Sequence, residues 1–302
     1  MQNRPIRQAK TAGGNILLCK VVLWRRCIAI LLLCFLAVVC GVAAYAEDIE
    51  TSPADPCSAS NPNALFSLLD RPTFSDSACA VPFGHAVLEL GYMRANLRGE
   101  GGGKSDSYPQ TEVRIGLPGQ NEIKFLAPNY TSQRSGNPPE AASGLSAAAI
   151  GIKHVLGYTD KWIGSIETVL TLPSGNDTFG SRGLGATLSG IAAYSVSDDV
   201  GISMQLGIGS LTDPVSAGGK RFTTFNQFLA LTWSPIERLQ LYGEVYGQTK
   251  TSRDEGAGFN FDGGLQYLVT HWLEIDVETG VRLSGNLGGF RHFYGAGVGI
   301  LF

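Results

Sequence analysis

The sequence predicts an all-β protein: a transmembrane antiparallel up-and-down β-barrel of 12 strands with a short disulfide-closed N-terminal segment. Three observations lead to this prediction. Residues of opposite character alternate in steps of two along most of the chain after Gly84, as in strands with two different faces. The connections between these segments alternate between short and long, and the tryptophans after residue 46 lie at or beside the short ones. Both features are typical of membrane barrels.

Residues 1–46 are predicted to be an export signal. A basic region precedes an apolar run from Cys27 to Ala44, and Ala44-Tyr45-Ala46 places small residues where signal peptidase reads them. We therefore expect cleavage before Glu47. An uncleaved membrane anchor is the alternative, because the apolar run has about the length of a short membrane helix.

Residues 47–83 form a second region, rich in Pro, Ser and Asp, that is predicted to be largely irregular. One short amphipathic helix is expected from Pro62 to Leu69, with Asn61 as its N-cap and Pro62 at its first position. The leucines of this helix need an apolar surface to cover.

Of the 6 cysteines, Cys57 and Cys79 remain once the signal is removed. In an oxidising compartment they most simply form a disulfide that closes this second region. Two free thiols are the alternative. The cysteines and the 4 dispersed histidines lack the spacing of metal ligands, so we expect neither a metal nor another cofactor.

Residues 84–302 are predicted to be the barrel. The clearest alternation sets Leu273, Ile275 and Val277 against Glu274 and Asp276. A soluble sandwich also alternates, so connection lengths and aromatic positions must decide. The predicted strands begin at Gly84 and continue with 110–117, 122–130, 144–158, 162–172, 185–195, 200–210, 223–233, 239–248, 258–269, 273–283 and 290–302.

The connections and aromatic residues favour the membrane barrel. Tight turns are expected near residues 119, 160, 198, 236 and 271, and long loops over 95–109, 133–143, 173–184, 212–222 and 251–257. Short turns are expected in the periplasm and long loops outside. Aromatic belts are predicted from Trp162, Trp233, Trp272, Tyr158 and Tyr194 at the short-turn rim, and from Tyr92, Tyr130, Phe222 and Phe259 at the opposite rim.

The charged residues of the strands are predicted to face the lumen, since a midplane Arg or Lys facing lipid costs on the order of 2–4 kcal/mol. These side chains either pair into a network that fills the interior or line a polar pore with a slight acidic bias, which favours neutral or cationic solutes. Tyr242, Tyr246 and Phe293 on the inner rows are placed to stack on an aromatic solute. The predicted inward residues are Glu89, Glu112, Arg114, Glu122, Lys124, Lys153, Glu167, Gln205, Tyr242, Glu244, Tyr246, Asp262, Glu274, Asp276, Glu278, Arg282 and Arg291.

The region 47–83 has two possible places. It docks on the periplasmic mouth or enters the lumen, where Gly295, Gly297 and Gly299 leave room near Glu89 and Gly91. Alternatively, it is a mobile tether.

Other functional classes lack support in the sequence. Gly99–Ser105 (GEGGGKS) resembles a phosphate loop, but Arg98 stands where its first glycine should be, and no helix pattern follows. No Gly-x-Ser-x-Gly elbow occurs. A barrel lipase needs Ser and His close together near the outer rim, whereas His154 is predicted near the inner one. We therefore expect that the protein is not an enzyme. The net charge of −3 gives no reason to propose a nucleic-acid partner.

Two stretches resemble a known family. Leu69–Pro82 (LDRPTFSDSACAVP) followed by Glu89–Tyr92 (ELGY), and Leu172–Asp177 (LPSGND) after a strand, are similar to the outer-membrane transporter family named for the MetA pathway of phenol degradation. The resemblance implies a small barrel that takes up aromatic or other organic compounds. It also implies that the barrel-insertion machinery reads the last strand, which ends at Phe302.

Together these features predict an exported protein of the bacterial outer membrane, in contact with its lipid, that acts as a passive channel for small organic molecules, aromatic ones included. The rival is a closed structural or surface-interaction barrel whose function lies in its long loops. A lipid-modifying enzyme of the outer membrane is the less favoured alternative.

Overall fold

The computed structural model describes residues 55–61, 63–99, 102–135 and 140–302, all within one compact unit, Glu50–Phe302. The predicted export signal lies outside the described residues. A short helix, α2 (Ala64–Leu68), precedes the strands. The strands are β1 (Ala86–Leu97), β2 (Gly103–Tyr108), β3 (Glu112–Leu117), β4 (Asn121–Leu126), β5 (Tyr130–Ser135), β6 (Ala141–Leu145), β7 (Ala149–Tyr158), β8 (Trp162–Thr171), β9 (Gly185–Ser195), β10 (Val200–Thr212), β11 (Arg221–Ile236), β12 (Leu239–Gln248), β13 (Gly258–Thr270), β14 (Leu273–Ser284) and β15 (Phe290–Leu301).

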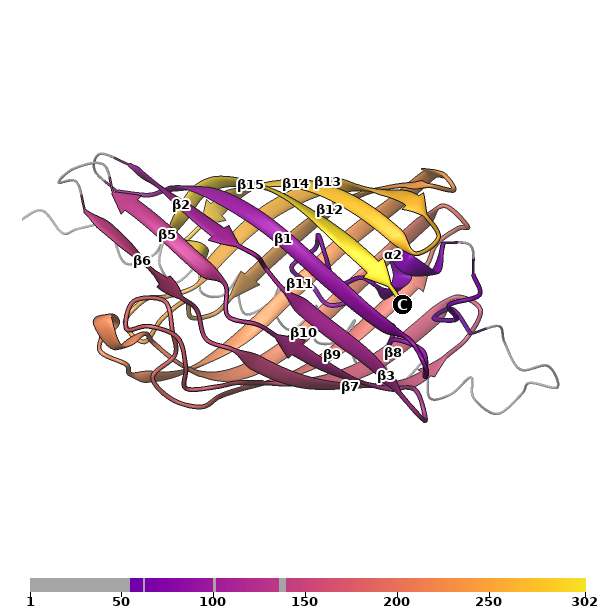
Figure 1. Cartoon of the computed structure of the whole chain (residues 1–302), viewed down its shortest axis with the longest axis horizontal. Helices are drawn as coiled ribbons and strands as arrows, with labels where there is room; N and C mark the ends of the chain where they lie inside the picture. The colour runs from indigo at the N-terminus through magenta and orange to yellow at the C-terminus, as the bar shows by residue number, and fades with distance from the viewer. Residues whose placement is uncertain (1–54, 62, 100–101, 136–139) are drawn as a thin grey trace, which may run out of the picture. The chain divides into compact units, whose positions relative to one another are not determined.

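The strands form one closed antiparallel sheet, because β15, the last strand, pairs along its length with β1, the first (Figure 1). Three strands of the barrel each consist of two pieces: β2 with β3, β4 with β5, and β6 with β7. Their registers are continuous, since Glu112 lies opposite Leu126 in the β3–β4 pair and Tyr108 lies opposite Tyr130 in the β2–β5 pair. The wall therefore has 12 strands, as predicted.

The three interruptions lie side by side in the wall, at residues 109–111, 127–129 and 146–148. Pro109 has no backbone N–H to donate to the ladder. Isolated hydrogen bonds bridge the interrupted positions, from Gln110 N–H to the Gly91 carbonyl at 2.8 Å and from Ala127 N–H to the Thr111 carbonyl at 3.0 Å. The wall at this height is consequently held by fewer regular backbone bonds than elsewhere.

The two faces of the strands match the membrane-barrel prediction. In β14, Glu274 and Asp276 are 0% and 3% exposed, whereas Ile275 and Val277 are 47% and 48% exposed. A soluble sandwich would bury the apolar row beneath a second sheet. Here the apolar row faces outward, which suits contact with lipid. Among the described residues, no helix is long and apolar enough to cross a membrane.

The loop prediction was wrong over 95–109 and 133–143. These residues mostly form paired strands, because β1 runs to Leu97, β2 starts at Gly103, and β5 and β6 pair with each other. Their side chains are polar on both faces, so they lack the alternating apolar row by which the other strands are recognised. The backbone hydrogen bonds form without it. Beyond the membrane, an apolar row is unnecessary.

Two smaller predictions were also wrong. The helix covers only Ala64–Leu68, and its N-cap is Asn63, which makes no side-chain cap bond. Asn61 instead donates its side-chain N–H to the carbonyls of Asp55 and Pro56. Phe222, assigned to the aromatic belt, is buried. Phe222 lies two residues before the buried Thr224 on β11, so its side chain faces inward.

The predicted disulfide between Cys57 and Cys79 is present, with 5.3 Å between the Cα atoms. It closes a loop that contains α2, whose Leu65 and Leu68 are fully buried. These leucines belong to an apolar cluster with wall residues of β1, β7, β8, β9 and β13. The helix thereby fills the short-turn end of the barrel, which Figure 1 shows beside the C-terminus.

Candidate functional site

The centre of the lumen is built around Asp70, which follows α2 in the inner segment (residues 64–82). Three cations from three wall strands contact its carboxylate: Lys124 Nζ at 2.8 Å, Arg114 Nη1 at 3.2 Å and Lys153 Nζ at 3.4 Å. These side chains come from β4, β3 and β7 and are almost completely buried. Buried charges require such pairing, because each isolated ion would pay a large desolvation penalty.

Burial alone would raise the pKa of the Asp70 carboxyl. The positive charges of Arg114, Lys124 and Lys153 outweigh burial and hold this pKa well below its ordinary value. Asp70 is therefore a carboxylate at neutral pH, so its negative charge holds the inner segment against the wall.

The same three cations also contact the wall carboxylates Glu122, Glu167 and Glu112, with N–O distances from 2.9 to 3.4 Å. Oxygen atoms of Asp70, Glu122 and Glu167 lie within 4.8 Å of one another, close enough to hold a metal ion. Each of these carboxylates already has an ammonium or guanidinium partner, however. The arrangement is an ion-pair network that joins the inner segment to the wall.

Arg71 makes the second charged connection. Its guanidinium lies 3.0 Å from Asp276 and 3.2 Å from Glu278 on β14, and it donates to the Gln110 side chain at 2.7 Å. A Cβ atom at Gly297 would collide with this guanidinium. The small-residue face of β15 thus leaves the space in which the Arg71 side chain lies.

Wall carboxylates also bind the backbone of the inner segment. Glu89 accepts hydrogen bonds from the N–H groups of Asp70 and Arg71 at 3.1 and 2.7 Å. Glu244 accepts hydrogen bonds from the N–H groups of Phe74 and Ser75 at 2.7 and 3.0 Å. These bonds satisfy N–H groups that have no secondary-structure partner. They also fix the path of the inner segment through the lumen.

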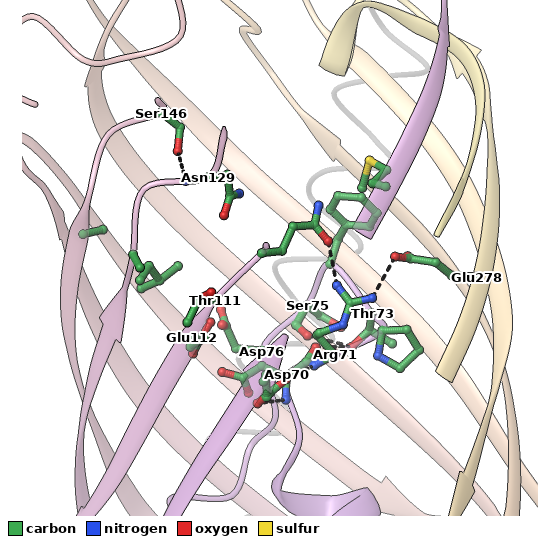
Figure 2. A pocket seen from close by; sticks show the side chains of 18 of the residues that line it. Asp70, Arg71, Thr73, Ser75, Asp76, Thr111, Glu112, Asn129, Ser146 and Glu278 are labelled. Atoms are coloured by element: carbon green, nitrogen blue, oxygen red, sulfur yellow. Dashed lines mark hydrogen bonds and ion pairs between the residues drawn. The ribbon is translucent and has the colours of Figure 1, made fainter. Parts of the chain in front are cut away.

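A cavity of about 400 Å³ remains between the inner segment and the wall. Figure 2 shows Arg71 and Glu278 on one side of it and Thr111 and Glu112 on the other. Asn129 and Ser146, which join their interrupted strands by a 2.8 Å hydrogen bond, lie farther along the same wall. The cavity therefore borders the part of the wall where the regular ladder is interrupted.

An aromatic group occupies the lumen next to this cavity. Phe74 of the inner segment stacks on Tyr246 with ring centroids 4.3 Å apart and meets Phe293 edge-on at 5.6 Å. Tyr246 and Phe293 are two of the side chains predicted to stack on an aromatic solute. In this structure their partner is the protein's own Phe74, which is 37% exposed and also lines the cavity.

The predicted lumen residues fall into three groups. Arg282 is half-buried, donates to the Gly285 carbonyl at 3.0 Å and lies near the long loops. Arg291 is exposed and contacts the Gly99 carbonyl at 3.5 Å, so neither arginine joins the central network. Glu112 is half-buried at the cavity. The remaining ones are buried: Glu89, Arg114, Glu122, Lys124, Lys153, Glu167, Gln205, Tyr242, Glu244, Tyr246, Asp262, Glu274, Asp276 and Glu278.

The sequence-based prediction missed Asp70, Arg71 and Phe74, although all three lie in the stretch that resembles the family. One signal could have found Arg71. The inward rows of β12, β13 and β14 carry several carboxylates, and their only inward cation, Arg282, lies at the loop end. Buried negative charges must be paired, so this excess predicts a cation from elsewhere in the chain. Arg71 supplies it.

A closed barrel with an apolar outer row, a charged inner row and a chain segment in its lumen defines an outer-membrane β-barrel. Among solved structures, the COG4313 outer membrane channel from Pseudomonas putida F1 shares this fold with a TM-score of 0.62 and 11% identity, over 76% of this chain and 100% of that chain. The KdgM and NanC porins are less similar, with TM-scores of 0.47 and 0.48 and 10% and 11% identity. They cover 72% and 71% of this chain and 99% and 98% of their own chains. No curated protein matches the sequence.

The family follows from the sequence itself. The family described as "Putative MetA-pathway of phenol degradation" matches residues 70–290, and the chain belongs to it. The match begins at Asp70, so it includes most of the inner segment as well as nearly all of the barrel.

Proposed function

We propose that the protein is an outer-membrane channel for the passive uptake of small organic molecules. Residues 1–46 serve as its export signal, 47–83 as a plug segment and 84–302 as the barrel. The cavity of about 400 Å³ beside the inner segment is the observation that carries this proposal, because cavities of this size hold small organic ligands. The similarity to an outer membrane channel supports it at the level of the fold.

The charge of the cavity favours particular solutes. Its lining contains one cation, Arg71, and several carboxylates. Carboxylate-lined pores favour cations over anions. The solutes are accordingly neutral or cationic. The carboxylates that line the cavity are Asp70, Asp76, Glu89, Glu112 and Glu278.

Glu112→Gln should lower the cation selectivity of the channel. Its Oε1 pairs with Lys124 at 3.2 Å, yet the side chain keeps 16% exposure at the cavity. Removing this negative charge should reduce the cation-to-anion permeability ratio about twofold. Reversal potentials in planar bilayers under a salt gradient measure the ratio. Glu237→Gln, in an exposed short turn, is the matched control and should leave it unchanged.

A bilayer that stays silent at all voltages would contradict the channel. It would favour the closed structural barrel, for which the charge network in the lumen is the supporting observation. If the channel conducts but Glu112→Gln leaves its ion selectivity unchanged, the ions do not pass through the cavity.

The position of Phe74 supports an aromatic solute. A phenyl ring already fits between Tyr246 and Phe293, so the lumen offers a stacking position of the right shape. Stacked or edge-on aromatic pairs contribute about 0.5–1.5 kcal/mol beyond burial. A solute ring entering this position must replace the ring of Phe74.

Phe74→Ala should therefore increase the uptake of aromatic solutes. The backbone N–H of residue 74 still binds Glu244 in the variant, so the inner segment stays docked. Liposome swelling should accelerate about threefold for the aromatic ammonium ion tyramine, and less for an aliphatic ammonium ion of similar size. Phe83→Ala, at a residue 70% exposed, is the control. Equal acceleration for both solutes would show a wider opening without aromatic selectivity.

The barrel-insertion machinery is the proposed partner of the closing strand. Phe302 is 66% exposed, and its backbone pairs with Ala86 on β1 through two hydrogen bonds. The side chain of Phe302 can therefore contact a partner while its backbone is paired with β1.

A further inference from the structure

The outer face of β15, β1, β2 and β5 carries polar side chains above the apolar band, at the end of the barrel where the long loops lie. The lowest row there is aromatic: the rings of Tyr92, Tyr108 and Tyr130 follow one another with centroid distances of 6.3 and 5.7 Å. All three are exposed. Such a row marks the membrane interface.

The next row toward the loops contains an ion pair. Arg94 on β1 lies opposite Asp106 on β2, with 2.5 Å between Nε and Oδ1. The Tyr92 hydroxyl donates to the same Asp106 oxygen at 2.5 Å. The guanidinium is therefore held against the wall, at a fixed height above the aromatic row.

The third row is basic. Lys104 on β2 lies directly opposite Arg134 on β5, and both are exposed. Asn96 continues the row toward His292, with 3.0 Å between the two side-chain nitrogens. Within the part of the chain that the structure describes, which omits 100–101 and 136–139, neither Lys104 nor Arg134 makes a direct ion pair, and Arg134 acts on the Asp106 carboxylate of the row below only at longer range.

Like charges directly opposite each other on one face of a sheet are destabilising. A bound anion would remove this repulsion, and Arg and Lys are the side chains that bind phosphate. The position of the basic row, just beyond the tyrosine row and the apolar band, indicates which kind of anionic molecule would bind there. A phosphate here would belong to a molecule whose apolar part lies along the outer band below the tyrosine row, beside exposed side chains such as Phe125 and Ile150.

We propose that this face, made of Lys104, Arg134 and Arg94 above the tyrosine row, binds the phosphorylated sugar head group of lipid A, the lipid of the outer leaflet in which the barrel would stand. The acyl chains lie along the apolar band, and the phosphates lie between the basic side chains. The inference rests on the outer-membrane placement within the proposed function, but not on transport.

The test is native mass spectrometry of the full chain in detergent, titrated with lipid A. Lys104→Ala/Arg134→Ala should bind lipid A at least about tenfold more weakly than the unchanged protein, since each basic residue contributes about 1 kcal/mol at an anionic lipid surface. Lys161→Ala/Arg238→Ala removes two exposed cations from the opposite, short-turn rim and should bind as tightly as the unchanged protein.

Three further ligands separate the sources of affinity. Lipid A without its phosphates, phosphatidylglycerol and inorganic phosphate should each bind at least about tenfold more weakly than lipid A. Equal binding by any of them, or by the Lys104→Ala/Arg134→Ala variant, would overturn the proposal. Bilayer conductance measured on the same samples reports the proposed function independently, because these side chains point away from the lumen.

Discussion

Asp70→Ala should release the inner segment from the barrel wall. The substitution removes the carboxylate shared by Arg114, Lys124 and Lys153. Breaking a buried ion pair by deleting one partner costs about 3–5 kcal/mol. The three cations keep wall carboxylates as partners, so the barrel itself should persist. The segment should become accessible, and the single-channel conductance should rise severalfold.

Hydrogen exchange over residues 64–81 measures the release directly. In the unchanged protein the N–H groups that bind Glu89 and Glu244 should be protected, and in Asp70→Ala they should exchange at least about a hundredfold faster. Asp160→Ala, in an exposed short turn, is the control. Continued protection in Asp70→Ala would show that the backbone bonds and α2 hold the segment without the ion pairs.

The sequence predicted the wall well because two solvents act on alternate residues. Glu274 and Ile275 are neighbours, yet hydrocarbon outside and charged groups inside leave each only one favourable side. The pattern therefore determines which residues face inward. It does not determine their partners, since parity says nothing about which cation meets which carboxylate across the lumen.

The inner segment shows this limit most clearly. Asp70 and Arg71 carry no periodic signal, and their partners lie as far along the chain as Asp276. Their roles follow from three-dimensional closure of the barrel, which brings β3, β4 and β14 around one short stretch. Polar hairpins such as β5–β6 were missed for a different reason, because they lie beyond the membrane and need no apolar face.

Cys57→Ser/Cys79→Ser should weaken docking of the inner segment by about 3 kcal/mol. The disulfide closes a loop that spans α2, Asp70, Arg71 and Phe74, and closing a loop of this size restricts the free segment by about that amount. Without it, the undocked segment gains conformational freedom. Exchange over residues 64–81 should accelerate on the order of a hundredfold. Reduction of the unchanged protein should produce the same result once the buried disulfide is reached.

Neither cysteine lies in a strand, so strand pairing should persist and the melting temperature of the barrel should fall by no more than the lost docking energy explains. A larger fall in barrel stability would mean that the closed loop supports the strand pairing of the wall as well as the inner segment. Asp70→Ala and Cys57→Ser/Cys79→Ser also test each other. If the ion pairs and the disulfide act on one docking equilibrium through separate contacts, their free-energy costs should nearly add. The Cys79 carbonyl, however, accepts a hydrogen bond from Arg114 Nη2 at 3.1 Å. A combined cost clearly below the sum would locate the coupling at Arg114, the residue that contacts both Asp70 and the Cys79 carbonyl.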